Sequence, residues 1–486
     1  MLNLITQITI IHNNSSETSN DFSLANYITS QTNIDLKQGN PIGTSINYVD
    51  NRTNINAVLS NSKGGQSTTS HFFIEQLINS TQDVAFTFNW VNEVEISTAF
   101  KNQLDRAKIT LPRNLDFDGF NIAKQGNNGL IPLFKRGDRI VISLGYTQTG
   151  LKKMFQGYIS HIGMTTPLVI ECEDMMYVLK QTRCQYPTAS DISSGNSKLG
   201  LRALLERILL GQNNPLMLPS QDNFNFVNDI SQLNTANSSS NKIPVIVSPD
   251  TSPFTYTTEK EKSVSEVINE LKNKLGIYIF FDDFGNLHAE LPYINLNNIA
   301  SFKKFKYENQ VIDDKNMKFQ ENNDIKLKVI YSSKRSNKLA QPPVLYAQTI
   351  IGGQITIDKN TGIGKIIGGQ VALDAKGKPL NFVGDASADS ITVNAPDDMS
   401  QDDLNYYGLL LWQSQKYTGW AKGSTFETFG EPAVYLGEAV ILDSRDYPEK
   451  NGTYAVVSVN RKFDINGYRQ IIEIGPQLSK NNTSLK

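Results

Sequence analysis

Between residues 84 and 173 apolar side chains recur at nearly every second position, the period of a β-strand with one buried face. Turn-forming strings interrupt this pattern at residues 112–114, 135–138 and 165–167. The pattern therefore predicts short antiparallel strands in a small barrel or a strongly curved sheet, because closure removes exposed strand edges. The alternating positions are Phe86, Phe88, Trp90, Val94, Ile96, Ile140, Ile142, Leu144, Ile159, His161, Val169 and Glu171.

A second β region begins near residue 318, resumes after residue 425 and ends at residue 474. Between its parts, residues 337–424 are predicted to be an insertion with a glycine-rich, hairpin-like stretch and a helix near residues 402–416. Ser400 begins that helix, with Asp403 three residues further on. The first part of the region is indicated by the alternation of Ile325, Leu327, Val329 and Tyr331.

Helical patterns lie between the two β regions. Leu201, Leu204, Leu205 and Ile208 share one helix face ahead of Gly211. A second helix begins with a capping box of Ser263 and Glu266, and ends at Gly276. A β-hairpin follows, with strand 277–281, turn 282–286 and a return strand from residue 287.

These patterns predict a mainly β chain with an α/β middle, organised as two small β-barrel domains, an α+β middle region and insertions. Residues 1–84 are polar and form an extension that packs on neighbours, because alone they bury little surface. Residues 85–185 are the first barrel, and 186–317 are the middle region. Residues 318–336 and 425–486 together form the second barrel, interrupted by the insertion at 337–424.

The charge balance argues against a chain-wide nucleic-acid binder, since the formal net charge is -2. Two cysteines and four histidines are too few for a disulfide framework or a multi-cysteine zinc site. No apolar run reaches the length of a membrane span, about 18 residues. The N-terminus lacks the basic start of a signal peptide, so we expect folding in a cytoplasm.

Each motif that suggests catalysis has a simpler structural interpretation. The string GIGKI at residues 362–366 lacks the glycine offset and the Ser/Thr of a phosphate-binding loop, and a β-hairpin is the favoured alternative. The histidines, at positions 12, 71, 161 and 288, are too far apart in sequence for a zinc-hydrolase motif. Cys172 alternates with Glu171 and Glu173 on a predicted strand, where a thiol packs as a small apolar group.

Paired carboxylates are the remaining enzymatic candidates, as in glycoside hydrolysis. Asp174 precedes an apolar run and is predicted to cap a helix. Asp282 and Asp283 are predicted turn residues, and Asp397 and Asp398 precede a helix whose positive end favours anions. We therefore expect no catalytic residue, no cofactor and no metal. The candidates considered were Glu171, Glu173, Asp174, Asp282, Asp283, Asp397 and Asp398.

The string FKKFKY at residues 302–307 interleaves basic and aromatic residues, a pattern that suits single-stranded nucleic acid. On a strand, we expect the phenylalanines on one face and Lys303, Lys304 and Lys306 on the other. A solvated sheet face is the favoured interpretation.

The chain also resembles the baseplate hub proteins of contractile phage tails, a family that includes late control protein D and the hub part of the type VI secretion spike. The resemblance to the first hub barrel rests on residues 104–113 (LDRAKITLPR), 134–140 (FKRGDRI), 144–146 (LGY), 155–159 (FQGYI), 167–174 (PLVIECED) and 179–180 (LK). The second barrel is matched by residues 425–432 (TFETFGEP), 436–440 (LGEAV), 452–456 (GTYAV) and 467–475 (GYRQIIEIG). The match covers residues 85–185, 263–335 and 420–478; no spike needle or lysozyme-like domain is expected.

The resemblance implies two barrels of the tail-tube type in each chain. Three copies then close into a homotrimeric ring of six barrels that joins a six-fold tail tube to a three-fold central spike. The implied partners are the tail tube protein, the spike, other baseplate proteins and a tape-measure protein, with DNA passing through a channel without specific binding. The implied location is the virion tail tip, after assembly in the host cytoplasm. Two alternatives remain open: a tail-associated wall-degrading hydrolase, and a hub-like distal tail protein of a noncontractile tail.

Two further expectations concern single features. Gly137-Asp138 and Gly437-Glu438 occupy similar places, a turn that feeds a strand, which suggests an internal duplication and a positive φ at both glycines. The channel wall is expected to be neutral or acidic, with the 303–306 lysines pointing away from it, because tight phosphate contacts would oppose passage of DNA.

Overall fold

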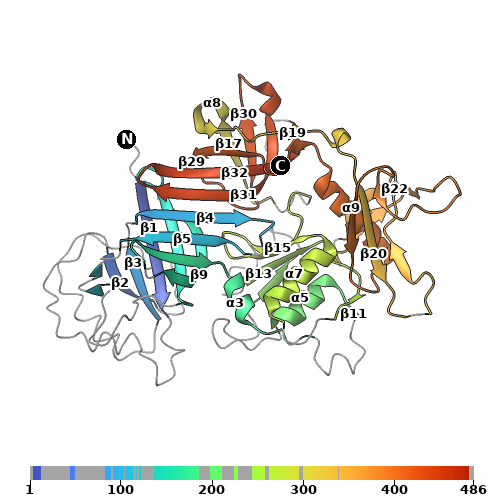
Figure 1. The fold of residues 1–486 in the computed structure, drawn as a ribbon, viewed down its shortest axis with the longest axis horizontal. Helices are drawn as coiled ribbons and strands as arrows, with labels where there is room; N and C mark the ends of the chain where they lie inside the picture. Colours follow the sequence, from blue (N-terminus) through green and yellow to red (C-terminus); the bar gives the residue numbers. More distant parts are fainter. Residues whose placement is uncertain are drawn as a thin grey trace.

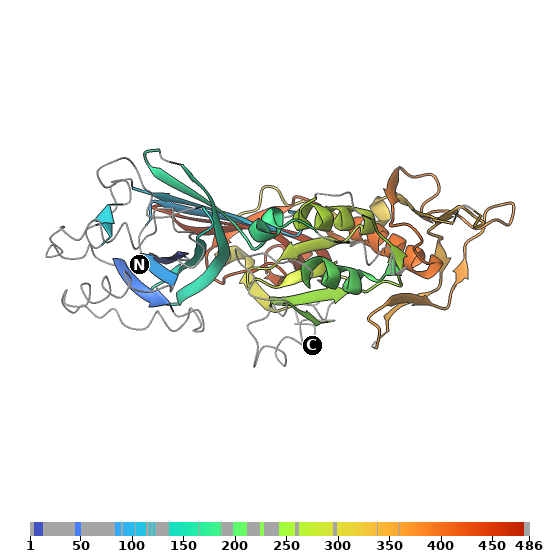
Figure 2. The same cartoon turned by 90° about the horizontal axis from the view of Figure 1, so that it is seen from below.

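The computed structural model describes residues 4–12, 44–49, 83–88, 91–102, 104–112, 116–117, 120–121, 136–163, 165–184, 186, 198–210, 224–227, 243–257, 262–294, 299–337, 339–358 and 360–480. These residues form a mainly β structure with large antiparallel sheets and a mixed α/β middle region, which confirms the predicted fold class. The molecule is elongated, with the N-terminal strands at one end and the insertion at the other (Figures 1 and 2).

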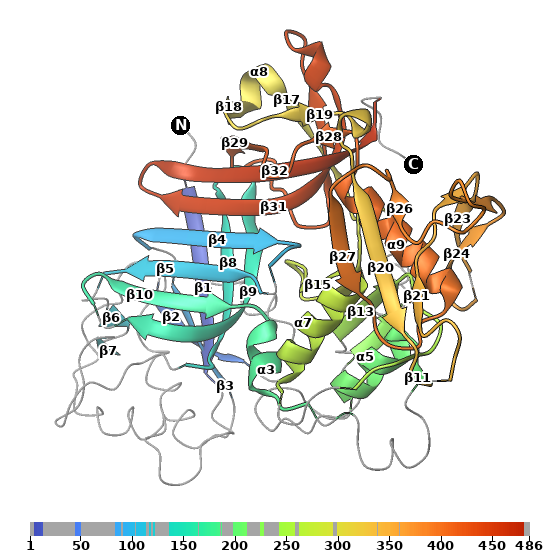
Figure 3. The same ribbon diagram turned by 45° about the vertical axis from the view of Figure 1, so that its right-hand side comes forward.

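The first β module is an antiparallel array in the order β4-β5-β10-β9-β8-β1-β3-β2. In Figure 3, β8 and β1 cross behind β4, β5 and β10, so the sheet curls around its own core. The strand bounds are β1 (Leu4–His12), β2 (Thr44–Val49), β3 (Asp83–Phe88), β4 (Glu93–Ala99), β5 (Arg106–Leu111), β6 (Asp116–Phe117), β7 (Phe120–Asn121), β8 (Arg139–Tyr146), β9 (Gly150–Gly163) and β10 (Leu168–Glu173).

The structure corrects the predicted boundary at residue 84. Strand β1 lies between β8 and β3, and its Ile8 and Ile10 are fully buried in the core of the first module. The first module therefore begins at Leu4 rather than at residue 85. The sequence gives little sign of this strand, because it is short, polar residues follow it, and its partners β3 and β8 lie far away in sequence.

The second β module has the order β18-β29-β32-β31-β30-β17. Strand β17 lies in the predicted middle region, yet it pairs in parallel with β30. The alternating segment that predicted the start of this module belongs to the insertion instead. The bounds are β17 (Phe302–Lys306), α8 (Tyr307–Gln310), β18 (Val311–Asp313), β19 (Phe319–Gln320), β28 (Gly419–Trp420), β29 (Thr425–Phe429), β30 (Ala439–Asp443), η6 (Pro448–Lys450), β31 (Gly452–Asp464) and β32 (Gly467–Ser479).

The two modules repeat one six-strand arrangement. The order β4-β5-β10-β9-β8-β1 matches β18-β29-β32-β31-β30-β17, and the chain runs through the first five matched strands in the same sequence. An equivalent hydrogen bond aligns the repeats: Ile159 N–H donates to the Asp138 carbonyl at 2.9 Å, and Val456 N–H to the Glu438 carbonyl at 3.2 Å. The repeats differ at their last pair, which is antiparallel in β8–β1 and parallel in β30–β17.

The modules are continuous through one pairing. The first half of β31 pairs with β30, and its second half, residues 458–463, pairs with β4 of the first module. Apart from β6 and β7, the strands of both modules therefore belong to a single sheet, in which β31 lies between β32 and β4 (Figure 1). Closure of each module into a separate barrel stays a prediction.

Gly137 and Gly437 have φ values of 95° and 87°, which confirms the expected positive φ at both turns. An added Cβ at Gly437 would meet no atom within 4 Å, so only the backbone conformation demands glycine there.

The middle region contains a four-stranded mixed sheet in the order β12-β13-β16-β15. Ser263 and Glu266 form the predicted capping box of α7, and Gly276 ends that helix at φ 67°. The hairpin β15–β16 is also confirmed. The bounds are α3 (Met176–Gln181), β11 (Lys198–Leu199), α5 (Leu201–Leu210), β12 (Phe224–Val227), β13 (Ile243–Ser248), β14 (Phe254–Thr255), α7 (Val264–Leu275), β15 (Tyr278–Phe281) and β16 (Leu287–Glu290).

The insertion is built on β20, which pairs with β21, β26 and β27, and α9 lies against this sheet (Figure 3). Ser400 caps α9 by accepting the Asp403 N–H, as predicted. The string at residues 362–366 leads into β24 of a β-hairpin, as expected. The bounds are η5 (Asn322–Asp324), β20 (Lys328–Lys334), β21 (Val344–Tyr346), β22 (Ile350–Ile351), β23 (Gln354–Ile357), β24 (Gly364–Ile367), β25 (Gln370–Val371), β26 (Val383–Gly384), β27 (Ser390–Asn394) and α9 (Gln401–Gln415).

Among the described residues, no helix combines the length and the apolar character needed to cross a membrane.

Candidate functional site

The carboxylates of β10 and of the residue that follows it have different partners. Glu171 lies on the exposed side of the strand opposite Lys108, and Glu173 pairs with Lys180 at 2.8 Å. Asp174 turns into the protein, where its Oδ1 accepts the Met176 N–H at 2.9 Å and its Oδ2 accepts the Asp105 N–H at 3.1 Å. The bond to Met176 is close to the predicted cap, although α3 begins one residue later than expected.

Cys172 packs in the core of the first module with 1% of its surface exposed, as predicted. Burial raises the pKa of its thiol well above the ordinary range, so the group stays a thiol. His161 is exposed on β9, and the backbone of His12 lies in β1. His71 lies outside the described residues. In the part of the chain that the structure describes, no three His, Cys, Asp or Glu side chains are arranged so that together they could hold a metal ion.

His288 forms a buried charge cluster with Asp282 and Glu290. Its Nε2 lies 3.0 Å from Asp282 Oδ2, and its Nδ1 lies 2.6 Å from Glu290 Oε1. Burial alone would lower the pKa of His288, but the bonds to the two carboxylates raise it to about 10. Burial alone would raise the pKa of Asp282, yet the imidazolium and Asn286 hold it below its ordinary value. The cluster fixes the β15–β16 hairpin, so Asp282 is more than a turn residue.

Asp283, the second predicted turn residue, forms a fully buried ion pair with Arg461 of β31. The two contacts are 3.2 Å and 3.3 Å long, and the side chains are 1% and 0% exposed. Asp283 Oδ2 also accepts the Leu436 N–H at 2.9 Å, while Arg461 donates to the Val434 carbonyl at 2.7 Å. The pair therefore joins the middle region to the second module, on the strand that also pairs with β4.

A buried pair of acids, Asp105 and Asp174, lies at the end of β5 and β10. Burial raises the pKa of Asp174 to about 7, and burial together with the neighbouring acids raises that of Asp105 well above its ordinary value. Asp105 Oδ1 accepts the Ala99 N–H at 3.1 Å and so closes the β4–β5 turn. Because the folded state binds protons that the unfolded state has released, this pair makes the free energy of unfolding fall as the pH rises from about 4 to 7.

The β8–β9 turn docks on the segment that precedes β30. Lys152 pairs with Glu431 at 2.8 Å, and the Tyr146 hydroxyl donates to the Tyr468 carbonyl at 3.0 Å. Gln470 is fully buried and donates to the carbonyls of Phe429 and Pro432. The Lys152–Glu431 and Tyr146–Tyr468 contacts therefore also tie the first module to the second.

Asp398 links the insertion to the middle region rather than acting as a simple helix-end anion. Its carboxylate accepts from Thr255 at 2.8 Å and from the Ser336 N–H at 2.9 Å, and it pairs with Lys198 at 3.3 Å. Burial opposes ionisation, but these bonds lower the pKa of Asp398 below its ordinary range. Asp397 contacts the same residue through its backbone, since its carbonyl accepts the Thr255 N–H at 2.8 Å.

The predicted faces of β17 are wrong. Phe305 is fully buried, but Phe302 lies on the other face, together with Lys304 and Lys306, because residues three apart on a strand point in opposite directions. Lys303 pairs with Glu438 at 3.2 Å, and Lys304 pairs with Asp443 at 2.7 Å. Both lysines are therefore partly neutralised within the chain.

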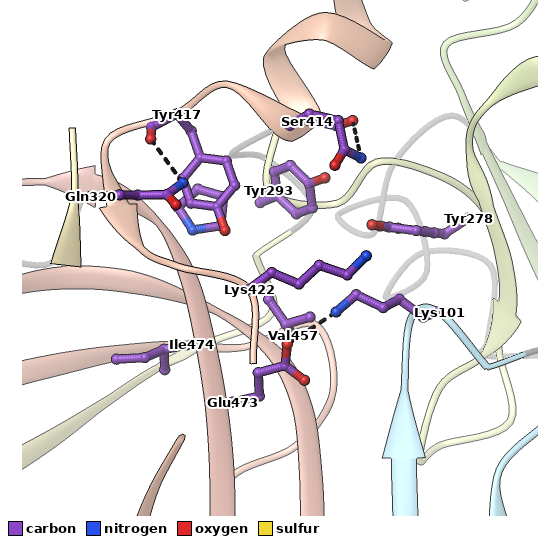
Figure 4. A pocket seen from close by; sticks show the side chains of 12 residues that line it. Lys101, Tyr278, Tyr293, Gln320, Ser414, Tyr417, Lys422, Val457, Glu473 and Ile474 are labelled. Carbon is purple, nitrogen blue, oxygen red and sulfur yellow. Dashed lines mark hydrogen bonds and ion pairs between the residues drawn. The ribbon is translucent and has the colours of Figure 1, made fainter. Parts of the chain in front are cut away.

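A small pocket of about 100 Å³ opens where the modules, the middle region and α9 meet (Figure 4). Lys101 and Lys422 extend into it, and the Lys101 ammonium lies 3.0 Å from the Glu473 carboxylate. Glu473 also accepts from Ser458 and the Gly423 N–H. The pocket is lined by Lys101, Tyr278, Tyr293, Gln320, Ser414, Gln415, Tyr417, Lys422, Val457, Glu473, Ile474 and Pro476.

The sequence interpretation missed the buried charges at these joints. One signal was present: His288 and Glu290 alternate with the apolar Leu287, Ala289 and Leu291, which places two ionisable groups on one face of an otherwise apolar strand. Arg461 gave no comparable signal, because its partner is 178 residues away in sequence.

No family model and no curated protein matches the sequence. Solved structures similar to this chain include a 43 kDa tail protein of prophage MuSo2 from Shewanella oneidensis, with 13% identity, a TM-score of 0.43, and coverage of 80% of this chain and 95% of that one. A tail protein from Neisseria meningitidis has 9% identity, a TM-score of 0.43, and coverage of 80% and 93%. A component of the E. coli type VI secretion system has 8% identity, a TM-score of 0.37, and coverage of 79% and 73%.

Proposed function

We propose that this chain is a structural hub at the tip of a phage or phage-derived tail. The observation that carries the proposal is the repetition of one six-strand arrangement within one chain, joined into a continuous sheet by the β31–β4 pairing. Two such modules per chain let three chains present six similar positions around an axis. This arrangement suits a part that joins a six-fold tail tube to a three-fold spike.

In this proposal the function is assembly and conduction. A homotrimeric ring seats the spike on one side, nucleates the tube on the other, and leaves a channel for the genome or a tape-measure protein. Other baseplate proteins bind its outer surface, the ring assembles in the host cytoplasm, and the mature site is the tail tip of a contractile particle. Rings of this kind need rigid joints, and the buried Asp283–Arg461 pair and the Glu431–Lys152 contact provide two of them.

The contacts of the candidate acids support a structural role over the hydrolase alternative. Asp174, Asp283 and Asp398 each accept a hydrogen bond from a distant segment of the chain, and Asp282 accepts one from Asn286 within its own hairpin. Glycoside hydrolysis needs two carboxyl groups that face one substrate site. These acids instead face the joints of the fold.

Native mass spectrometry of the full chain tests the proposal, alone and co-expressed with the tail proteins encoded beside it. We expect a homotrimer and a trimeric ring in images of the assembled tail tip. A monomer, a dimer or a true hexamer within the tail would contradict it. Peptidoglycan cleavage by the pure protein, lost on one carboxylate substitution with the fold intact, would favour the hydrolase.

A further inference from the structure

The pocket of Figure 4 lies where four parts of the chain meet. Lys101 follows β4 of the first module, and Tyr278 begins β15 of the middle region. Ser414 lies in α9 of the insertion, and Glu473 lies in β32 of the second module. The volume of about 100 Å³ is enough for several water molecules or for one small ion. A ligand in this pocket therefore has side chains of all four parts around it.

Two lysine side chains enter the pocket from different segments. Figure 4 shows Lys101 and Lys422 with their ammonium ends directed toward the same part of the cavity. Lys422 lies in the loop between β28 and β29 and is exposed, so solvent is open to its side chain as an alternative. Two like charges that converge repel each other unless a negative charge lies near them.

The one acid among the described lining residues compensates only one of these charges. Glu473 accepts from the Lys101 ammonium at 3.0 Å, from the Ser458 hydroxyl at 3.0 Å and from the Gly423 N–H at 2.9 Å. Burial opposes its ionisation, but these bonds hold the pKa of Glu473 below its ordinary value, so it is charged at neutral pH. The Lys422 ammonium has no hydrogen-bond or ion-pair partner within the described part of the chain. The lining therefore keeps one positive charge without a counter-charge.

The donors of the pocket indicate the kind of anion that fits. An ammonium group has three N–H donors, and Lys101 directs one of them at Glu473, so the two lysines keep five between them. A tetrahedral oxyanion offers four oxygen atoms to these donors, whereas a carboxylate offers two. A third lysine, Lys272 of α7, donates to the Lys101 carbonyl at 2.6 Å and adds positive charge to the same segment. A divalent tetrahedral ion therefore matches the site better than a carboxylate.

We propose that this pocket binds a small free oxyanion of the phosphate class between Lys101 and Lys422. The bound ion supplies the missing negative charge and joins the β4–β5 turn of the first module to the loop that precedes β29. Tyrosine side chains of the wall, at positions 278, 293 and 417, limit the space to a small ion. The inference goes beyond the proposed function and does not depend on it, because the lining residues belong to a single chain.

Phosphorus-31 NMR of the full chain with inorganic phosphate tests the site at constant ionic strength. We expect saturable line broadening with a dissociation constant on the order of 1 mM or below. Lys422→Gln should weaken binding by about tenfold or more, because it removes a charged donor, while Lys422→Arg should retain binding. The matched control is Lys376→Gln, which removes an exposed lysine from the turn between β25 and β26 and should leave binding unchanged.

Hydrogen exchange gives a second readout. Phosphate should slow exchange in peptides covering residues 97–106 and 417–425 of the native chain, and should have no such effect in Lys422→Gln. Circular dichroism of each variant checks that the fold is intact; Lys422 is exposed, so we expect no change.

Several results would overturn the inference. They are the absence of saturable broadening, undiminished binding by Lys422→Gln, and equal weakening in Lys376→Gln, which would mean general attraction to positive charge. Adenosine monophosphate should bind about tenfold more weakly than phosphate or worse, because its nucleoside does not fit a pocket of this size; equal binding would contradict the assignment to a free ion. None of these measurements requires a trimer, so their failure leaves the hub proposal standing.

Discussion

Replacing Arg461 with methionine should strongly destabilise the joint between the middle region and the second module. The substitution removes the guanidinium but leaves the Asp283 carboxylate, 1% exposed, without its counter-charge. Removing one member of a buried ion pair typically costs about 3–5 kcal/mol, because the remaining charge stays desolvated. The lost donor to Val434 leaves a buried carbonyl and adds about 1 kcal/mol. We therefore expect a loss of about 4 kcal/mol in the free energy of unfolding.

Urea unfolding of the full chain, followed by near-ultraviolet circular dichroism, measures the loss. Hydrogen exchange of peptides covering residues 277–292 and 430–465 should localise it to the joint. The matched control is Arg445→Met, because Arg445 is 88% exposed beside Asp446 and such surface pairs contribute at most about 1 kcal/mol.

A double variant separates the charge from the packing. Asp283→Asn retains an acceptor for the Leu436 N–H, so adding it to Arg461→Met should recover at least about 2 kcal/mol. A loss below about 1 kcal/mol in the single variant, or no recovery in the double variant, would refute the reasoning.

Three shorter predictions concern pH, a turn and DNA. Because burial raises the pKa of Asp174 to about 7, the free energy of unfolding should fall on the order of 3 kcal/mol between pH 4 and pH 7, and Asp174→Asn should flatten that slope in urea titrations at each pH; an unchanged slope would contradict the assignment. Gly437→Val should cost more than about 1 kcal/mol because of its positive φ, while Gly437→Asn should cost less; equal costs in thermal unfolding would exclude a backbone cause. Since Lys303 and Lys304 already have acidic partners, we expect weak DNA binding by the assembled protein and little change in Lys304→Gln. Tight, salt-sensitive binding that this substitution abolishes would revive the nucleic-acid interpretation.

The features that the sequence predicted correctly depend on short-range signals. The capping box of α7, the Ser400 cap of α9 and the β15–β16 hairpin each lie within a few residues, and alternation identified β8 and β10. The positive φ of Gly137 and Gly437 followed from the turn that each motif requires. In these segments local preference and the final fold agree.

The features that could not be predicted from the sequence depend on long-range pairing. Strand β1 is recognised only through β8, more than a hundred residues away, and the bond between Thr98 and Val459 spans 361 residues. The faces of β17 follow position rather than residue type, so Phe302 and Phe305, three residues apart, point in opposite directions. A buried ion pair such as Asp283–Arg461 gives no local pattern, because each charge alone resembles a surface residue.

The repeat also explains where the insertion lies. In the first module β4 leads into β5 through a short turn closed by Asp105, whereas in the second module the equivalent connection, from β18 to β29, contains β20–β27 and α9. At this connection, therefore, the second module carries a large added unit and the first module only a short turn. In the proposed ring of six modules, such units would project at every second position. Three chains, each built from two similar modules, would in this way present six similar sets of strands to a tube. They would present a three-fold outline to a spike, without needing a second kind of subunit.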